Sequence, residues 1–401
     1  MWADTLTTLP VPVPEATPLA LRYNRGNDIL WVVDTLVGFL VPGVMLFAGW
    51  SARLRAWAER MTGRRWIPTL LLYVVAFIVV TSLATLPLDF YEGFVRQHAY
   101  GLSDQALSKW TGDVIKGLLL ACIALPLGAL IPYGLLRWSP RRWWLWSTAA
   151  ALPLLVALNF VGPIWLSPLF NRYGPLQDKA LEARILSEAE RAGVHGSRVF
   201  EVNKSVDTKA ISAYVTGFGA TKRIVLYDTI LQKLDSDEIV FVVGHEIGHF
   251  VLRHVLLGLL GSWLVVGASL YAIHRLAGHV LATYRDQVGF ERLDDPASVP
   301  LLLLLSSVVS LVATPLLLAG SRHLEHEADR FGLELTRNNH AAATAFVKLQ
   351  QENLGIPRPG AFYTIFRGSH PSLADRIEFA NDYHPWATGA PLVYGDHFAR
   401  P

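Results

Sequence analysis

Two histidines and a glutamate in one short segment have the spacing of a hydrolytic metal site. Residues 243–250 read VGHEIGHF and lead almost directly into a membrane-length apolar stretch. On a helix, His245 and His249 lie on one face, where two neutral imidazoles can bind one Zn²⁺. Glu246 would lie beside that metal as a candidate general base. Two ligands do not complete a site, so the chain has to supply a third.

The best candidate for the third ligand lies far downstream, in segment 321–329, which reads SRHLEHEAD. A carboxylate at Glu325 would leave the fourth zinc position open for water, as a catalytic site requires. Asp329, one helical turn further on, can accept the second ring N–H of a ligating histidine and fix its orientation. The alternative motif with a third histidine shortly after His249 is excluded, because Val255 occupies that position.

Each pattern taken alone has a simpler explanation. A histidine pair of this spacing also arises by chance, and many such matches bind nothing. Acidic residues at helical spacing are common on a solvated helix face. The two segments, however, both lie at the ends of apolar stretches, which can bring them to the same side of a membrane. This placement favours one shared zinc site.

The composition is that of an integral membrane protein. Hydrophobic residues make up 52% of the chain, charged residues only 17%, and the mean hydropathy is +0.33. The formal net charge of +2 and the lack of a basic cluster interleaved with aromatic residues exclude a nucleic-acid surface. Cys122 is the single cysteine, which excludes both an internal disulfide and a thiolate zinc site.

Six apolar windows are long enough to cross a bilayer, which takes roughly 20 residues of helix. They lie near residues 29–50, 67–88, 114–136, 143–168, 254–274 and 298–320. The predicted organisation is a flexible leader (1–28), membrane helices one to four (29–168), a soluble catalytic segment (169–253), membrane helices five and six (254–320) and a segment with the third ligand and further catalytic residues (321–401).

The soluble segment is predicted to contain a helix over 178–192 and then a small sheet. Residues 199–202, 210–215 and 224–227 are rich in β-branched and aromatic residues and are separated by glycines and charged turns. An edge strand beside the metal can pair with an extended peptide substrate. We expect Ala213, Tyr214 and Val215 to form that edge.

The chain resembles the CAAX prenyl protease 1 family of integral-membrane zinc metalloproteases. The resemblance runs in matching order over roughly 29–385 and includes the zinc helix. Its other residues are Phe90-Tyr91, Phe94-Val95, Gly101-Leu102, Pro168-Leu169-Phe170-Asn171, Pro175-Leu176, Ala213-Tyr214, Gly217-Phe218, the run from Lys222 to Thr229, Ser321-Arg322, Glu325, Ala328-Asp329, Asn353-Leu354-Gly355, His370-Pro371 and Arg376.

The resemblance implies a mainly α-helical, polytopic fold in which tilted membrane helices surround a water-filled chamber, with a gluzincin-like catalytic domain. It implies that His245, His249 and Glu325 bind Zn²⁺, that Glu246 is the base and that Asp329 supports a ligand histidine. It further implies that His370 stabilises the tetrahedral intermediate and that Arg376 orders the site. Without the resemblance, His370 and Arg376 are a weak signal, since a loop histidine and a helix arginine explain them equally well.

Two departures from the family limit what the resemblance implies. Ser212 stands where family members commonly have the asparagine of an Asn-Ala-Tyr sequence, so a substrate-orienting amide is absent. Eukaryotic members also have one more membrane helix near the N-terminus and a longer insertion before the zinc helix. The absence of that helix and of the longer insertion indicates a bacterial member of the family, located in the inner (cytoplasmic) membrane. A prenylated substrate is not assumed for such a member.

These observations predict a monomeric zinc metalloendopeptidase embedded in the bilayer and acting on peptide or protein substrates. One alternative is a quality-control protease with broad specificity for unfolded membrane proteins. Another is a non-catalytic chamber or transporter whose histidines hold a structural ion; the open fourth position and Glu246 argue against it.

The side of the membrane that the zinc site faces is predicted differently by two arguments. Arginines gather in the loops around 53–65, 137–142 and 275–292, on the side away from the zinc segments. By the positive-inside rule, these loops would face the cytoplasm. The family resemblance instead places the zinc site on the cytoplasmic side. We follow the resemblance, because the positive-inside rule does not apply well to long soluble segments.

Overall fold

The computed structural model describes residues 9–217 and 222–398, and these form a mainly helical molecule. Within them, six helices are long and apolar enough to cross a membrane, one for each predicted window. They are α1 (Pro18–Phe47), α3 (Trp66–Phe90), α5 (Leu107–Trp138), α6 (Trp143–Val161), α10 (His254–Val288) and α11 (Val299–Thr336). The prediction of a polytopic helical protein is therefore confirmed.

Shorter helices connect these spans or build the part of the molecule at one end of them. The α-helices are α2 (Trp50–Thr62), α4 (Arg96–Ala99), α7 (Lys179–Arg191), α8 (Asp228–Lys233), α9 (Ser236–Val251), α12 (Asn339–Glu352), α13 (Ala361–Phe366), α14 (Leu373–Asp382) and α15 (Pro385–Thr388). Single turns of π- or 3-10 helix cover 91–95, 162–166, 167–169, 204–206, 296–298 and 395–397.

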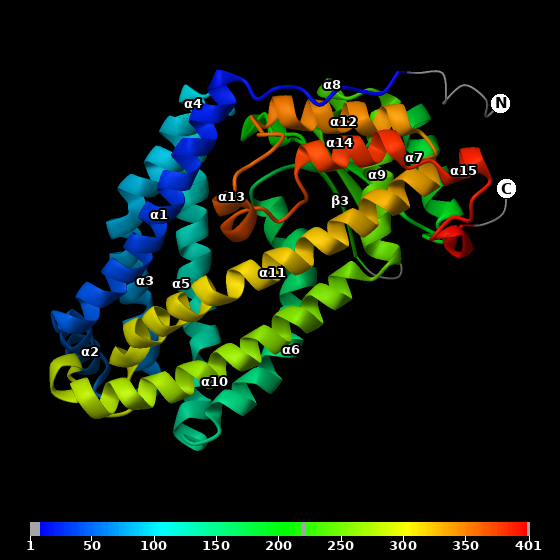
Figure 1. Ribbon diagram of the computed structural model, residues 1–401. Coiled ribbons are helices and arrows are strands. Elements are labelled where there is room, and N and C mark those ends of the chain that lie inside the picture. Colours follow the sequence, from blue (N-terminus) through cyan, green and yellow to red (C-terminus); the bar gives the residue numbers. More distant parts are fainter. Residues whose placement is uncertain (1–8, 218–221, 399–401) are drawn as a thin grey trace.

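The longest helix, α11, belongs to both parts of the molecule. It runs beside α10 through the membrane part and continues into the group formed by α9, α12 and α14 (Figure 1). The apolar window ends near residue 320, but the helix goes on without a break to Thr336. The segment that carries Glu325 and Asp329 is therefore the rigid extension of the sixth membrane helix.

The predicted flexible leader is wrong for the described residues before Asp28. Helix α1 already begins at Pro18, because the Thr17 hydroxyl accepts a hydrogen bond from the amide of Ala20 (3.1 Å) and proline is favourable at the first helical position. Before the helix, the backbone N–H and C=O of Val11 both bond the Asn381 side chain, each at 2.9 Å. This segment is thus held against α14, and residues 1–8 of the predicted leader lie outside the described residues.

A four-stranded sheet lies between the membrane helices and the zinc helix in sequence. Its order is β1 (Tyr173–Pro175), β2 (Arg198–Val202), β4 (Arg223–Tyr227) and β3 (Ala213–Thr216), with β2 and β4 parallel and the other pairs antiparallel. The three predicted strands are confirmed, although β3 begins at Ala213 and not at residue 210. Strand β1 was not predicted, because a Tyr-Gly-Pro segment has neither the length nor the alternation of a typical strand. As expected, β3 is an edge strand.

Two separate hydrophobic cores correspond to the two parts of the molecule. One lies among the membrane helices and includes Leu70, Tyr73 and Ile273. The other joins the sheet to α7, α9, α11 and α12, and includes Ile224, Ile247 and Phe331. The predicted helix at 178–192 is α7; Asp178 caps it by accepting hydrogen bonds from the amides of Ala180 and Leu181.

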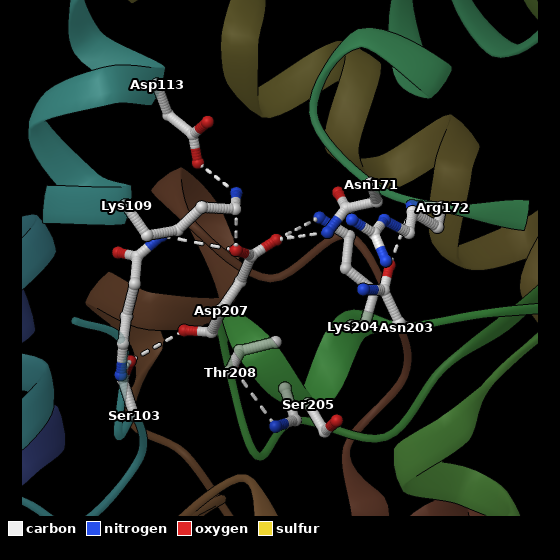
Figure 2. A network of polar contacts seen from close by, with 12 residues as sticks. Ser103, Lys109, Asp113, Asn171, Arg172, Asn203, Lys204, Ser205, Asp207 and Thr208 are labelled. Atoms are coloured by element: carbon white, nitrogen blue, oxygen red, sulfur yellow. Dashed lines mark hydrogen bonds and ion pairs between the residues drawn. The ribbon is translucent and has the colours of Figure 1, made fainter.

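A polar network centred on Asp207 joins these two parts (Figure 2). One carboxylate oxygen of Asp207 accepts hydrogen bonds from Lys109 (3.0 Å) at the start of α5 and from Gln105 (3.2 Å). The other accepts from Asn171 (2.7 Å) and Lys204 (3.0 Å), which belong to the sheet region. One half-buried carboxylate therefore ties the end of a membrane helix to the catalytic part.

Candidate metal centre

The helix that carries the histidine motif, α9, starts at a defined cap. Asp235 accepts hydrogen bonds from the amides of Asp237 and Glu238, and the Glu238 carboxylate accepts one from the Asp235 amide, so that both halves of a capping box are present. The helix then runs to Val251. Its periodicity places His245 and His249 on the face that meets α11.

Glycines at the crossing bring α9 and α11 unusually close together. A Cβ added to Gly248 on α9 would lie 3.0 Å from the Cβ of Phe331, and one on Gly332 of α11 would lie 3.0 Å from the backbone nitrogen of His245. Any larger residue at these positions would push the helices apart. The small residues therefore fix the distance between the histidines on one helix and the carboxylates on the other.

The three predicted ligands converge at this crossing. The Nε2 atoms of His245 and His249 are 3.1 Å apart; one Glu325 oxygen lies 3.4 Å from that of His245, and the other lies 3.4 Å from that of His249. Donor atoms bound to one tetrahedral zinc at about 2.0–2.2 Å are about 3.3–3.5 Å from one another, so this spacing fits a single ion. Among the described residues, these three form the group of side chains that can hold a metal.

The Nδ1 side of His245, away from the other proposed ligands, contacts a buried ion pair. The His245 Nδ1 lies 2.8 Å from an oxygen of Asp329, and Arg376 donates two hydrogen bonds to the same carboxylate, at 2.6 and 2.8 Å. Burial lowers the pKa of His245, but its contacts with Asp329 and Glu325 outweigh burial and raise the pKa to about 10. The centre therefore attracts positive charge, as a site for a divalent cation does.

The candidate base and the candidate oxyanion donor lie around the same centre. Glu246 lines the pocket beside His245, and burial raises the pKa of its carboxyl group. The His370 side chain, on the loop between α13 and α14, is 53% exposed, and its Nε2 lies 3.2 Å from a Glu325 oxygen. Ser369 contacts the other ring nitrogen of His370 at 2.8 Å. The loop residue thus reaches the metal-ligand set from the open side of the pocket.

A pocket of about 460 Å³ opens in front of these groups. Ser212 and Ala213, at the start of the edge strand, line it together with His245 and Glu246. Tyr214 and Val215 are not among its lining residues. The Tyr214 hydroxyl instead contacts that of Tyr173, at 3.2 Å.

Comparison with known proteins identifies the family. Residues 175–384 match peptidase family M48, and residues 15–172 match the N-terminal region of CAAX prenyl proteases, described as five membrane helices. The chain belongs to peptidase family M48. Of the five helices in that description, the structure has four long ones in this region, α1, α3, α5 and α6, and the much shorter α2.

Relatives of this M48 peptidase cover most of its length. The metalloprotease YhfN of Bacillus subtilis is 37% identical over 92% of this chain and 86% of its own. The CAAX prenyl protease 1 homolog of Oryza sativa is 30% identical over 78% of this chain and 73% of its own. The crystal structure of S. mikatae Ste24p superimposes with a TM-score of 0.76 at 23% identity, covering 90% of this chain and 87% of that one.

Family and fold together establish the class of activity. This M48 peptidase is a membrane-embedded metalloendopeptidase of a zinc-dependent family, and it acts on peptide or protein substrates in a membrane environment. The resemblance to the CAAX prenyl protease 1 family is confirmed. The two alternatives, a broad quality-control protease and a non-catalytic chamber, are not favoured by these relatives.

One wall of the pocket is formed by residues that the sequence did not indicate. Tyr23, Asn24 and Asn27, from the first three turns of α1, line it together with His245 and Glu246 of the zinc helix. The Asn24 amide donates hydrogen bonds to the carbonyl of Ala20 (3.0 Å) and to that of Leu354 (2.7 Å), which fixes α1 against the C-terminal part. These residues fall in the stretch that was predicted to be a leader, so no local pattern assigned them to the site.

Proposed function

We propose that this M48 peptidase binds one Zn²⁺ through His245, His249 and Glu325 and hydrolyses peptide bonds. The observation that carries the proposal is the 3.1 Å separation of the two Nε2 atoms, with a Glu325 oxygen 3.4 Å from each, which fits a tetrahedral ion with one position left for water. When bound, zinc lowers the pKa of a coordinated water toward about 7 and polarises the scissile carbonyl.

The other steps of the proposed reaction are assigned to the side chains around the metal. Glu246 takes the proton from the attacking water; its raised pKa keeps it basic enough for that transfer. His370 donates a hydrogen bond to the oxyanion of the tetrahedral intermediate. Asp329 and Arg376 keep His245 in the orientation and tautomer that ligation requires.

The substrate lies extended along β3. Ser212 and Ala213 line the pocket beside Glu246, and among the described strands β3 has only β4 as a neighbour, so its outer edge can pair with a peptide. Tyr214 and Val215 continue that edge away from the metal. Ser212 offers a hydroxyl where many relatives have an amide, so backbone pairing has the larger part in holding the substrate.

The proposed setting is the inner membrane of a bacterium, where the protein acts as a monomer on peptide or protein substrates. Residues 169–253 and 321–401 form the catalytic unit, and the helices within 29–168 and 254–320 carry it. The similarity to a Bacillus subtilis metalloprotease over 92% of the chain supports this setting.

The test uses purified full-length protein, a peptide library and mass spectrometry, with and without zinc. Glu246→Gln is expected to retain zinc but lose at least about 10²-fold in kcat, because the proton acceptor is gone. His245→Ala and Glu325→Ala are expected to lose the metal itself. Cleavage by Glu246→Gln at the wild-type rate would show that another group is the base. Indiscriminate cleavage of unrelated unfolded proteins would replace our proposal with the quality-control function.

A further inference from the structure

The second ligand histidine, His249, has an unusual partner for its outer ring nitrogen. His245 faces the Asp329 carboxylate, but the Nδ1 of His249 lies 3.0 Å from the Nδ1 of another histidine, His254. The two rings cross at 74° with their centroids 5.0 Å apart. His254 is only 4% exposed, so its side of this contact is buried, whereas the His249 side chain is 21% exposed.

A tight turn between two helices brings His254 to this place. Helix α9 ends at Val251, and α10 begins at His254 after Arg253, whose φ of 59° is left-handed. The turn folds His254 back over the last turn of the zinc helix. Its outer nitrogen, Nε2, then lies 3.5 Å from an oxygen of Glu327 on α11, between the ligand Glu325 and Asp329 in sequence.

The hydrogen positions along this chain of contacts follow from the ligation of His249. A histidine that binds a metal through Nε2 is neutral and carries its proton on Nδ1. The Nδ1–H of His249 therefore donates to His254, whose own Nδ1 accepts. A neutral His254 that accepts at Nδ1 carries its proton on Nε2, on the side of the Glu327 carboxylate, with which it makes an electrostatic contact at 3.5 Å and not a hydrogen bond. The ligation of His249 thus determines which nitrogen carries the proton in both histidines.

We infer that His254 is a positioning residue for the metal ligand His249 and is itself oriented by Glu327. The inference rests on the proposed zinc site and assigns it a second support. This support comes from α10 and α11, whereas the Asp329 and Arg376 pair behind His245 comes from α11 and α14. The two supports differ in charge. His245 faces the buried Asp329 carboxylate, which is paired with Arg376. His249 faces the neutral imidazole of His254, which in turn lies near the partly exposed Glu327.

The test is the zinc affinity of a matched pair of variants, measured by competition with a chelator. Asparagine and leucine branch alike, but only the side-chain oxygen of asparagine can accept the His249 N–H. His254→Leu is expected to weaken zinc binding about 10–100-fold, the usual cost of losing such a partner. His254→Asn is expected to restore most of it. Glu327→Ala is a second variant, for which a smaller loss is expected.

Two controls separate this role from packing and from the proposed function. His279→Leu changes an exposed histidine on the same helix and should leave zinc affinity unchanged. The melting temperature of each metal-free variant reports on packing alone. Equal affinities for wild type, His254→Leu and Glu327→Ala would overturn the inference, and so would equal losses for Leu and Asn. A wild-type protein that binds no zinc would instead overturn the proposed function.

Discussion

Asp329 shows how one residue can serve both the metal ligand and the stability of the catalytic part. Its side chain is 1% exposed and holds His245 on one side and Arg376 on the other. In Asp329→Asn the shape is kept, but the charge that balances Arg376 is lost. We expect zinc affinity to fall about 10–100-fold and the protein to lose about 3–5 kcal/mol of stability, since a buried cation is left unpaired. Chelator competition and chemical unfolding in detergent measure the two effects.

A double variant separates those two effects. Adding Arg376→Met to Asp329→Asn removes the unpaired cation, so part of the lost stability should return. The zinc affinity should stay low, because His245 still faces an amide in place of a carboxylate. If the double variant recovered both quantities, the carboxylate would act through Arg376 and have no role in orienting the histidine.

At this scale, the sequence could predict those ligands whose relation is local. His245, Glu246 and His249 lie within one helical turn of each other, so their geometry follows from the helix alone. Glu325 and Asp329 were assigned because both apolar segments end on the same side of the membrane and because of the family resemblance. His254 was missed, because its contact depends on a left-handed turn at Arg253, which no spacing rule indicates.

Among the elements, the crossing of α9 and α11 decides whether the ligands meet. A Cβ at Gly332 would lie 3.0 Å from the nitrogen of His245 and 3.2 Å from its Cα, and these backbone atoms cannot move away cheaply. Gly332→Ala is therefore expected to cost about 1–3 kcal/mol of stability. It should also weaken zinc binding, because His245 is displaced relative to Glu325. Thermal unfolding and zinc content measure both.

Gly320→Ala is the matched control for that substitution. Gly320 lies on the same helix, and nothing comes within 4 Å of a Cβ placed there. Its stability and zinc content should both stay close to wild type. Wild-type behaviour of Gly332→Ala as well would mean that the two helices can separate without harm to the site.

The elements themselves were largely predictable, and the exceptions have physical reasons. Apolar windows and β-branched runs identified the six long helices and three strands. The helix of the sixth span, however, continues past its apolar window, because hydropathy reports the membrane boundary and not the end of the helix. The start of α1 was placed too late, since its first turns are polar and face the catalytic pocket.

The membrane helices and the catalytic part must keep a fixed relative position for the whole molecule to work as one unit. Lys109 and Gln105 approach Asp207 from the α5 side, and Asn171 and Lys204 approach it from the sheet side. Ser103 adds a hydrogen bond to the Asp207 backbone carbonyl, at 2.6 Å. These groups come from three segments, 103–109, Asn171 and 204–207, that are far apart in sequence and share no motif, so the network could not be predicted from the sequence.

The Asp207 carboxylate gives this junction a defined pH dependence. Burial raises its pKa, but hydrogen bonds from Asn171, Lys204 and Lys109 outweigh burial and hold the pKa below the ordinary value of 3.8. A carboxylate with a lowered folded-state pKa stabilises the fold above the unfolded-state value, and this contribution is lost as the pH falls through the folded-state pKa. Asp207→Asn should therefore lower the stability by about 1–3 kcal/mol at neutral pH, where charged hydrogen bonds are removed.

The difference between wild type and Asp207→Asn should shrink as the pH falls below 3.8, because the wild-type carboxylate becomes protonated as well. Asp104→Asn is the control: Asp104 is 74% exposed in its ion pair with Lys209, and such a pair contributes at most about 1 kcal/mol. Melting in detergent across this pH range measures both variants. A loss in Asp207→Asn that stayed constant down to the lowest pH would mean that the shape of the side chain, and not its charge, holds the two parts together.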